Sequence, residues 1–186
     1  ILVNNTASGL FELDAGASDV IELEELQIQG GTGNVHINVT GPGRLYLRKC
    51  TVLSGYIAHD ATGIDARVYI DDCRFIVTQV AYSVNTENVF ISNCQISASV
   101  AVFVGSVNSV SITDSTIAAP YVFFVADAED AHVSNCTITA NIVFGITNDS
   151  SSISVTSCKL TGSLSTTLVV TVGMGTHTQH TLSDNI

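Results

Sequence analysis

The sequence predicts an all-β fold in which the chain winds into a solenoid of short parallel strands. One eight-residue pattern recurs roughly every 22 residues: alternating apolar positions, then a polar corner, then a cysteine or serine. A repeat of this length is typical of solenoids, because a single unit cannot bury its own apolar side and must stack on its neighbours. The six copies are LYLRKCTV from Leu45, VYIDDCRF from Val68, VFISNCQI from Val89, VSITDSTI from Val110, AHVSNCTI from Ala131 and ISVTSCKL from Ile153.

Each repeat is expected to hold three short strands and three turns. The first strand alternates up to its corner, as at Val89, Ile91 and then Asn93, which indicates a half-buried strand. A second strand starts after the corner and turns Ile96 inward, and an apolar run over 100–104 supplies the third. Three strands in about 21 residues make one coil of a parallel β-helix, and about seven coils are expected.

Four of the corners carry Asn or Asp, and these side chains are expected to point inward and stack as a ladder. Stacked Asn amides pair with one another at the cross-β spacing. Lys49 and Ser157 interrupt the ladder towards its two ends. The ladder consists of Asp72, Asn93, Asp114 and Asn135.

With these corners and the repeated pattern, roughly residues 20 to 172 resemble the right-handed parallel β-helix repeat of pectate-lyase-like proteins, many polysaccharide-active enzymes and bacteriophage tailspikes. The resemblance implies a right-handed solenoid and, through its phage members, a parallel homotrimer with aligned axes. It implies no particular activity. One domain is expected over 1–186, with an N-terminal coil or cap over 1–19 and a polar C-terminal tail over 173–186. The start at Ile1 and the polar end favour a segment of a longer protein.

Composition narrows the classes of partner. Hydrophobic residues make up 46% of the chain and charged residues 12%, so a continuous core is expected. The net charge of −11, with six Lys and Arg in all, makes nucleic acid an improbable partner and disfavours acidic polysaccharide. No apolar run reaches the ~18 residues that span a bilayer, so no membrane insertion is expected.

The five cysteines occupy the same position of successive repeats, directly after the corner, with Ser115 taking that position once. We expect free, buried thiols there, since a cysteine behaves as a small hydrophobe. A disulfide between Cys73 and Cys94 is the alternative that coil spacing allows. The odd count and the absence of CxxC spacing favour folding in a reducing cytoplasm. No metal or cofactor is expected, and His177 and His180 are interpreted as a solvated pair.

The third strand of three successive repeats is apolar on both faces, which indicates burial on both sides. An outward apolar patch of this kind predicts a subunit interface, with a covering terminal segment as the alternative. The predicted interface residues are Val100, Val102, Val104, Tyr121, Phe123, Val125, Ile142, Phe144 and Ile146.

A candidate ligand surface lies on the first strand, where aromatic residues recur at one outward position. Rings beside polar groups suit a sugar. Ordinary cross-strand stacking that stabilises the sheet is the alternative. The predicted ligand residues are Tyr46, Tyr69 and Phe90, with Arg48 and Asp71 beside them.

Catalytic residues are weakly indicated. A glycosidase needs two carboxylates roughly 5 to 9 Å apart, but the acidic turn after the third strand is more typical of a solvated polar edge. A lyase would also need a basic residue, and none lies near this turn in the sequence. The candidates are Asp127, Glu129, Asp130 and Asp149.

Three function classes follow. The leading one is a structural or adhesive module of a phage virion (tailspike, fibre or capsid decoration), associated as a homotrimer with other virion proteins and possible contact with a polysaccharide. A secreted, extracellular polysaccharide-degrading enzyme is the second. Ice binding is the third and least favoured, because the threonines (for example Thr116, Thr137 and Thr139) are too irregular for a lattice match.

Overall fold

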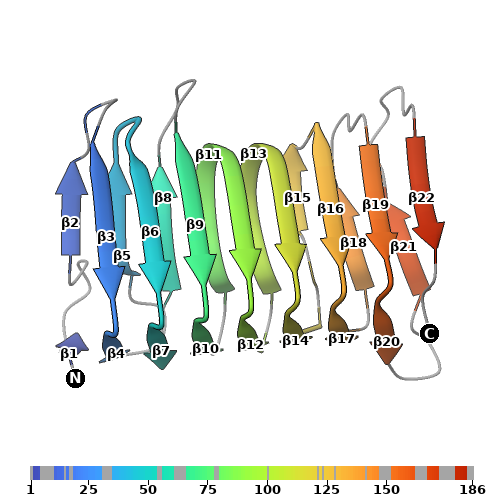
Figure 1. Cartoon of the computed structure of the whole chain (residues 1–186), viewed down its shortest axis with the longest axis horizontal. Helices are drawn as coiled ribbons and strands as arrows, with labels where there is room; N and C mark the ends of the chain where they lie inside the picture. The colour runs from blue at the N-terminus through green and yellow to red at the C-terminus, as the bar shows by residue number, and fades with distance from the viewer. Residues whose placement is uncertain are drawn as a thin grey trace.

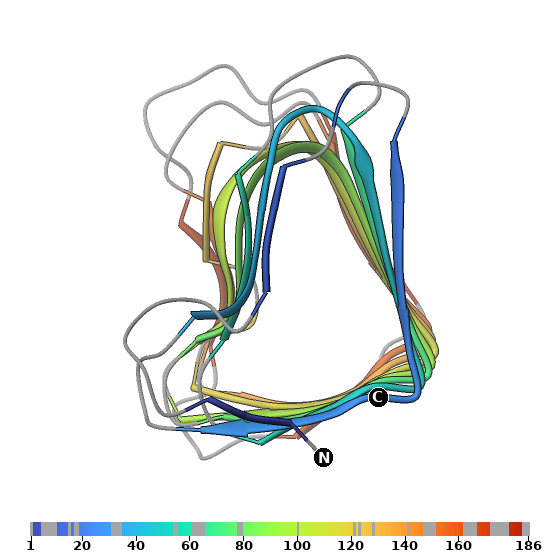
Figure 2. The same ribbon diagram turned by 90° about the vertical axis from the view of Figure 1, so that its left-hand side faces the viewer.

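The protein is a parallel β-solenoid. Its strands stack side by side along one axis from the N-terminus to the C-terminus (Figure 1), and the view along that axis shows a three-sided outline (Figure 2). Every described strand pairing is parallel, and no described residue is helical. The expected parallel solenoid is therefore confirmed. This computed structural model describes residues 2–4, 11–14, 16, 19–30, 35–53, 56–60, 66–77, 80–99, 101–120, 122, 124–127, 129–140, 142–146, 152–161, 167–171 and 179–183.

One side of the solenoid, here called the base sheet, contains the short strands that follow the corners. These strands pair in sequence order as an eight-stranded sheet. They are β1 (Leu2–Asn4), β4 (Gln27–Gly30), β7 (Thr51–Leu53), β10 (Arg74–Val77), β12 (Gln95–Ala98), β14 (Thr116–Ala118), β17 (Thr137–Thr139) and β20 (Lys159–Thr161).

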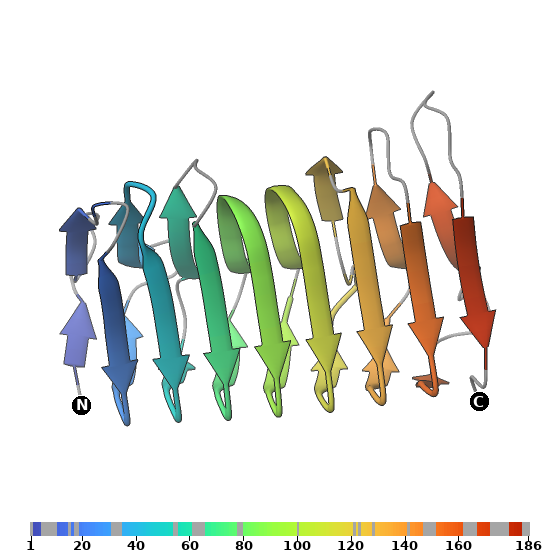
Figure 3. The ribbon, with the colours of Figure 1, turned by 45° about the horizontal axis from the view of Figure 1, so that its top comes forward.

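The other two sides, here called the back sheet and the front sheet, are joined because β11 (Val80–Ser92) and β13 (Ala101–Thr113) run without interruption from one to the other (Figure 3). The back sheet otherwise contains β2 (Phe11–Asp14), β5 (Val35–Thr40), β8 (Tyr56–Asp60), β15 (Phe124–Asp127), β18 (Ile142–Ile146) and β21 (Thr167–Thr171). The front sheet otherwise contains β3 (Val20–Glu24), β6 (Arg44–Arg48), β9 (Arg67–Asp71), β16 (Asp130–Ser134), β19 (Ser152–Thr156) and β22 (Gln179–Ser183).

The solenoid extends further than the repeat predicted. Strands β1 and β2 pair with β4 and β5, so the segment before residue 20 continues the base and back sheets. At the other end β22 pairs with β19 within the expected polar tail. Backbone pairing continues there although the sequence TQHTLS lacks the apolar alternation that marks the earlier strands.

The core consists of columns of inward side chains from successive coils. In the front sheet Ile91 lies opposite Ile70 and Ile112, and in the base sheet Ile96 lies opposite Phe75 and Ile117. All of these residues are buried. Fully burying one such side chain contributes about 1.5 to 3 kcal/mol, so stacking alone strongly favours the in-register arrangement.

The corner between the front and base sheets recurs in the same conformation, and Figure 2 shows the coils superimposing closely there. Seven successive corner residues have a positive φ between 51° and 57°. Asn and Asp tolerate this left-handed conformation better than other non-glycine residues. The corner residues are Glu25, Lys49, Asp72, Asn93, Asp114, Asn135 and Ser157.

The expected inward orientation of the corner side chains is wrong. Asp72, Asn93, Asp114 and Asn135 are all exposed. The Asn135 amide donates to the carboxylate of the corner residue Asp114 at 3.4 Å, but the Asn93 amide donates to Asp71 instead, at 2.9 Å. The polar corners therefore reflect a backbone requirement rather than a buried ladder.

The position directly after the corner is fully buried, as predicted, and its cysteines are free thiols. The thiol of Cys94 donates to the carbonyl of Ser92 at 3.0 Å, and the Ser115 hydroxyl donates to the carbonyl of Thr113 at 2.7 Å. In the other direction, the Cys94 backbone N–H donates to the Ser115 hydroxyl oxygen at 3.0 Å, as the Cys50 N–H does to the Cys73 sulfur at 3.4 Å. A small side chain with one donor and one acceptor thus links adjacent coils.

We predict that Asn93→Ala lowers the free energy of unfolding by about 1 kcal/mol more than Asn93→Gly, because an alanine disfavours the left-handed conformation. Both variants remove the hydrogen bond from the Asn93 side-chain amide to Asp71. The difference between their free energies of unfolding therefore measures the cost of the left-handed backbone conformation alone. Urea unfolding measures it. Equal midpoints for the two variants would show that the amide contact, and not φ, selects this residue.

A second prediction concerns the buried position after the corner. Ser115→Ala removes the acceptor of the Cys94 N–H and should cost about 1 to 3 kcal/mol of stability, the usual cost of a buried unsatisfied donor. Ser115→Cys retains a donor and an acceptor and should stay close to the parent protein. Similar losses in the two variants, by urea unfolding, would contradict a hydrogen-bonding role for this position.

Candidate functional site

The predicted aromatic column forms a continuous stack on the outer face of the front sheet. Tyr46 in β6, Tyr69 in β9 and Phe90 in β11 lie directly opposite one another in the strand register. The ring centroids of Tyr46 and Tyr69 are 4.5 Å apart with an interplanar angle of 6°, and those of Tyr69 and Phe90 are 5.0 Å apart at 13°. We call these three residues the aromatic ladder.

The stack leaves little ring face for a ligand. Both faces of Tyr69 are covered by its neighbours, and the guanidinium of Arg48 lies 5.4 Å from the centroid of Tyr46. The next residue in the column after Phe90 is the small Ser111, and Phe90 is 38% exposed. The surface offered to a ligand therefore consists of ring edges, tyrosine hydroxyl groups and the exposed part of Phe90.

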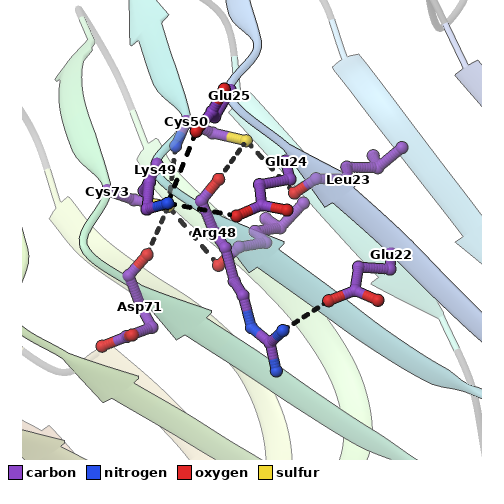
Figure 4. Close-up of polar contacts among 10 residues, drawn as sticks. Glu22, Leu23, Glu24, Glu25, Arg48, Lys49, Cys50, Asp71 and Cys73 are labelled. Carbon is purple, nitrogen blue, oxygen red and sulfur yellow. Dashed lines mark hydrogen bonds and ion pairs between the residues drawn. The ribbon is translucent and has the colours of Figure 1, made fainter.

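Charged groups beside the ladder are held by partners in adjacent coils, as Figure 4 shows for the N-terminal part of the site. Arg48 forms an ion pair with Glu22, and Lys49 lies 3.3 Å from Glu24 and 3.4 Å from Glu25. These two glutamates raise the pKa of Lys49 by hydrogen bonding and by their charge. The cations at this corner are therefore largely neutralised.

Asp71 is the fixed anion of the site. The Ser92 hydroxyl donates to its carboxylate at 2.7 Å and the Asn93 amide at 2.9 Å. These hydrogen bonds, the Ser92 bond first, lower the pKa of Asp71 below its ordinary value. Sequence reasoning identified Asp71 but missed Ser92 and Asn93, although their positions about 21 residues further on place them in the next coil.

The five predicted ligand residues are brought together around one small hollow of about 140 Å³. Its size suits part of one sugar ring or a few water molecules rather than a whole ligand. The hollow is lined by Tyr46, Leu47, Arg48, Tyr69, Ile70, Asp71, Phe90 and Ser92.

Beyond Ser111 the same column turns polar. His132 and Ser154 lie opposite each other, and the Nδ1 atom of His132 is hydrogen-bonded to the Ser154 hydroxyl. Both side chains lie on the outer surface of the front sheet, and no described carboxylate is hydrogen-bonded to this histidine. The pair has one element of a nucleophilic site but no third group to orient the imidazole.

Two of the four catalytic candidates have described side chains. Glu129 and Asp130 are exposed at the start of β16. The side chain of Asp127 and the whole of Asp149 lie outside the described residues. The nearby Glu87 accepts a hydrogen bond of 3.3 Å from Asn108 in the next coil, as expected of a solvated polar edge.

Most side chains of the predicted subunit interface are not among the described ones. The strand register nevertheless shows which of these residues lie opposite each other. Val104 lies opposite Phe124, and Gly105 opposite Val125, with an irregularity after Gly105. The expected column that joined Val104 to Val125 is therefore offset by one residue, which changes the face of a strand on which a side chain lies. Val125 and Ile146 do pair as expected.

None of the described residues belongs to a helix long and apolar enough to cross a membrane. Within the same residues no group of three or more His, Cys, Asp or Glu side chains is arranged as a metal site. Burial raises the pKa of the Cys136 thiol to about 11, so this cysteine lacks the thiolate character of a metal ligand or nucleophile.

The chain matches no protein-family model, no curated protein and no solved structure.

Proposed function

We propose that the chain is a structural and adhesive β-solenoid module of a phage virion protein, such as a tailspike, fibre or capsid decoration. It forms a right-handed helix of about seven coils, assembles as a homotrimer with other virion proteins, and contacts an uncharged surface glycan along the aromatic ladder. The virion setting and the handedness rest on the resemblance of the repeat to that of phage β-helix proteins.

The observation that carries the glycan contact is the arrangement of the ladder beside Asp71. Tyr46 and Tyr69 present hydroxyl groups one coil apart, and the carboxylate of Asp71 is held in place by two hydrogen bonds. Repeated donors and acceptors at one coil spacing of ~4.8 Å suit the hydroxyl groups of successive sugar units. A rigid row of such groups binds with little loss of conformational entropy.

The charge of this surface selects for an uncharged sugar. Glu22, Glu24 and Glu25 lie at its N-terminal end, and Arg48 and Lys49 are paired with them. Neither Arg48 nor Lys49 is therefore left unpaired to receive a carboxylate or sulfate. The resulting excess of fixed negative charge repels acidic glycans at short range.

We predict that Tyr69→Phe weakens binding of uncharged oligosaccharides on a glycan array by about three- to tenfold, the effect of losing one hydrogen bond. The ladder itself should survive, because phenylalanine retains the stack, and the unfolding midpoint should stay close to that of the parent. Tyr69→Ala should reduce both binding and stability. No oligosaccharide should be cleaved.

Two results would contradict this function. Full binding by Tyr69→Phe together with destabilisation in Tyr69→Ala would reduce the ladder to a sheet-stabilising device. New reducing ends or unsaturated sugar products, lost when Asp127 and Glu129 are both replaced by Ala, would instead favour the polysaccharide-degrading enzyme.

The homotrimer is proposed from three segments of the sequence that are apolar at successive positions, 100–104, 121–125 and 142–146. Phe123→Asp would place a carboxylate in a dry contact, which costs several kcal/mol when it has no partner, so we predict that this variant is monomeric. Sedimentation equilibrium measures the mass. Val20→Asp is the matched control, because Val20 is 56% exposed at the start of β3, and it should remain trimeric. A trimeric Phe123→Asp variant, or a monomeric parent, would contradict the proposed interface.

A further inference from the structure

The base sheet differs in charge from the rest of this acidic protein. None of its eight strands contains an Asp or Glu, although the chain carries 17 of them. The cations Arg74 and Lys159 lie in one outward column of this sheet, and both are exposed. The net charge of −11 is therefore not spread evenly over the surface: acids on the far sides are screened over about 8 Å at physiological salt, and those nearest these strands are the exposed corner residues Glu25, Asp72 and Asp114.

Arg74 is available to a ligand. Arg48 and Lys49 form ion pairs with glutamates, whereas the guanidinium of Arg74 forms none with a described residue, including the corner residue Asp72 two positions before it. A guanidinium with no described ion-pair partner, on a strand that contains no Asp or Glu, is a strong recognition group for a carboxylate, which it binds through two parallel hydrogen bonds.

An open groove of about 400 Å³ lies beside this guanidinium. Small side chains follow the larger ones across the register: Ser97 lies next to Ile76 and Ala118 next to Ser97, and Thr116 lies next to Gln95 two strands from Arg74. The volume falls within the range of small-molecule sites. Arg74, Ile76, Gln95, Ser97 and Thr116 are among the residues that line it.

The lining combines three kinds of contact. Arg74 supplies a positive charge, and Gln95, Ser97 and Thr116, from the next two strands β12 and β14, supply hydrogen-bonding groups on one side of it. Ile76, a large hydrophobic side chain that is nevertheless 41% exposed, lies two residues from Arg74 on the same face of β10. A matching ligand carries a carboxylate, several hydroxyl groups and a small apolar substituent.

We propose that this groove binds a monosaccharide unit that carries both a carboxylate and an N-acyl group, the chemistry of a sialic acid. Arg74 receives the carboxylate, Gln95 and the two hydroxyl side chains bind the polyol, and Ile76 packs against the acyl methyl group. The site goes beyond the proposed function, because it lies on a different sheet from the aromatic ladder and selects a charged sugar rather than an uncharged one.

The experiment titrates the full chain with three methyl glycosides and monitors binding by calorimetry and by backbone amide NMR shifts. N-acetylneuraminate carries both groups, glucuronate lacks the acyl group, and N-acetylglucosamine lacks the carboxylate. We expect N-acetylneuraminate to bind most tightly. Arg74→Gln should weaken it about tenfold or more, the effect of losing a charge-assisted hydrogen bond, and the matched Arg48→Gln variant on the front sheet should not.

Ile76→Thr separates the acyl contact from the charge. It should weaken N-acetylneuraminate and leave glucuronate unchanged, and because threonine suits an exposed strand position, the fold should be retained. Far-UV circular dichroism and the unfolding midpoint check each variant. Tyr69→Phe should leave this binding intact, so failure of the ladder proposal and failure of the groove proposal are distinguishable.

Four results would overturn the proposal. The first is that the parent protein shows no saturable binding of N-acetylneuraminate. The second and third are that Arg74→Gln binds N-acetylneuraminate as tightly as the parent, and that the parent binds glucuronate as tightly as N-acetylneuraminate. The fourth is that the solution mass of Arg74→Gln differs from that of the parent. The last would mean that a second copy of the chain occupies the groove.

Discussion

Hydrogen bonding between successive corners is the constraint on which the structure depends. The backbone N–H of Asn93 donates to the carbonyl of Thr113 in the next coil at 3.3 Å, and the backbone N–H of Asp114 donates to the carbonyl of Ser134 at 3.2 Å. The parallel ladder therefore continues through the bend only if every coil bends in the same way. A left-handed residue at each corner supplies that bend, and the buried Cys or Ser that follows supplies a side-chain link between coils where the corner would otherwise leave an N–H unpaired.

The repeat predicted the fold because its signals are local and periodic. Apolar alternation placed the inward columns correctly, and the position after the corner is buried as expected. The orientation of Asn93 could not be obtained in the same way, since a polar residue at a fixed position is equally consistent with a buried amide ladder and with a left-handed φ. Terminal strands such as β22 were missed because backbone pairing with an existing sheet edge holds Gln179–Ser183 in place without an apolar pattern.

At the candidate site, too, some features could be predicted from the sequence and others could not. Aromatic residues spaced by one coil were enough to predict that Tyr46, Tyr69 and Phe90 stack, but the covering of the ring faces depends on interplanar angles that no sequence pattern provides. The offset between Val104 and Val125 has a comparable origin. Val104 and Gly105 pair with residues 20 positions further on, whereas the other repeats suggested 21, and the irregularity after Gly105 restores a spacing of 21 at Ser106 and Asp127. A one-residue offset is enough to exchange the two faces of a strand.

The outer faces of the front sheet and the base sheet differ in charge because residues at the same position of successive repeats lie in one column of the solenoid. Residues two positions apart lie on the same side of a strand, and residues one coil apart lie opposite each other, so one substitution changes a single element of a column. On the front sheet Glu24 and Asp71 lie on either side of Arg48 in one column, and Arg48 forms its ion pair with Glu22. On the base sheet the column from Arg74 to Lys159 passes through Gln95, Thr116 and Thr137 without a carboxylate. A chain with a single net charge can in this way present one face that repels anions and another that receives them, and the net charge alone does not exclude an acidic ligand.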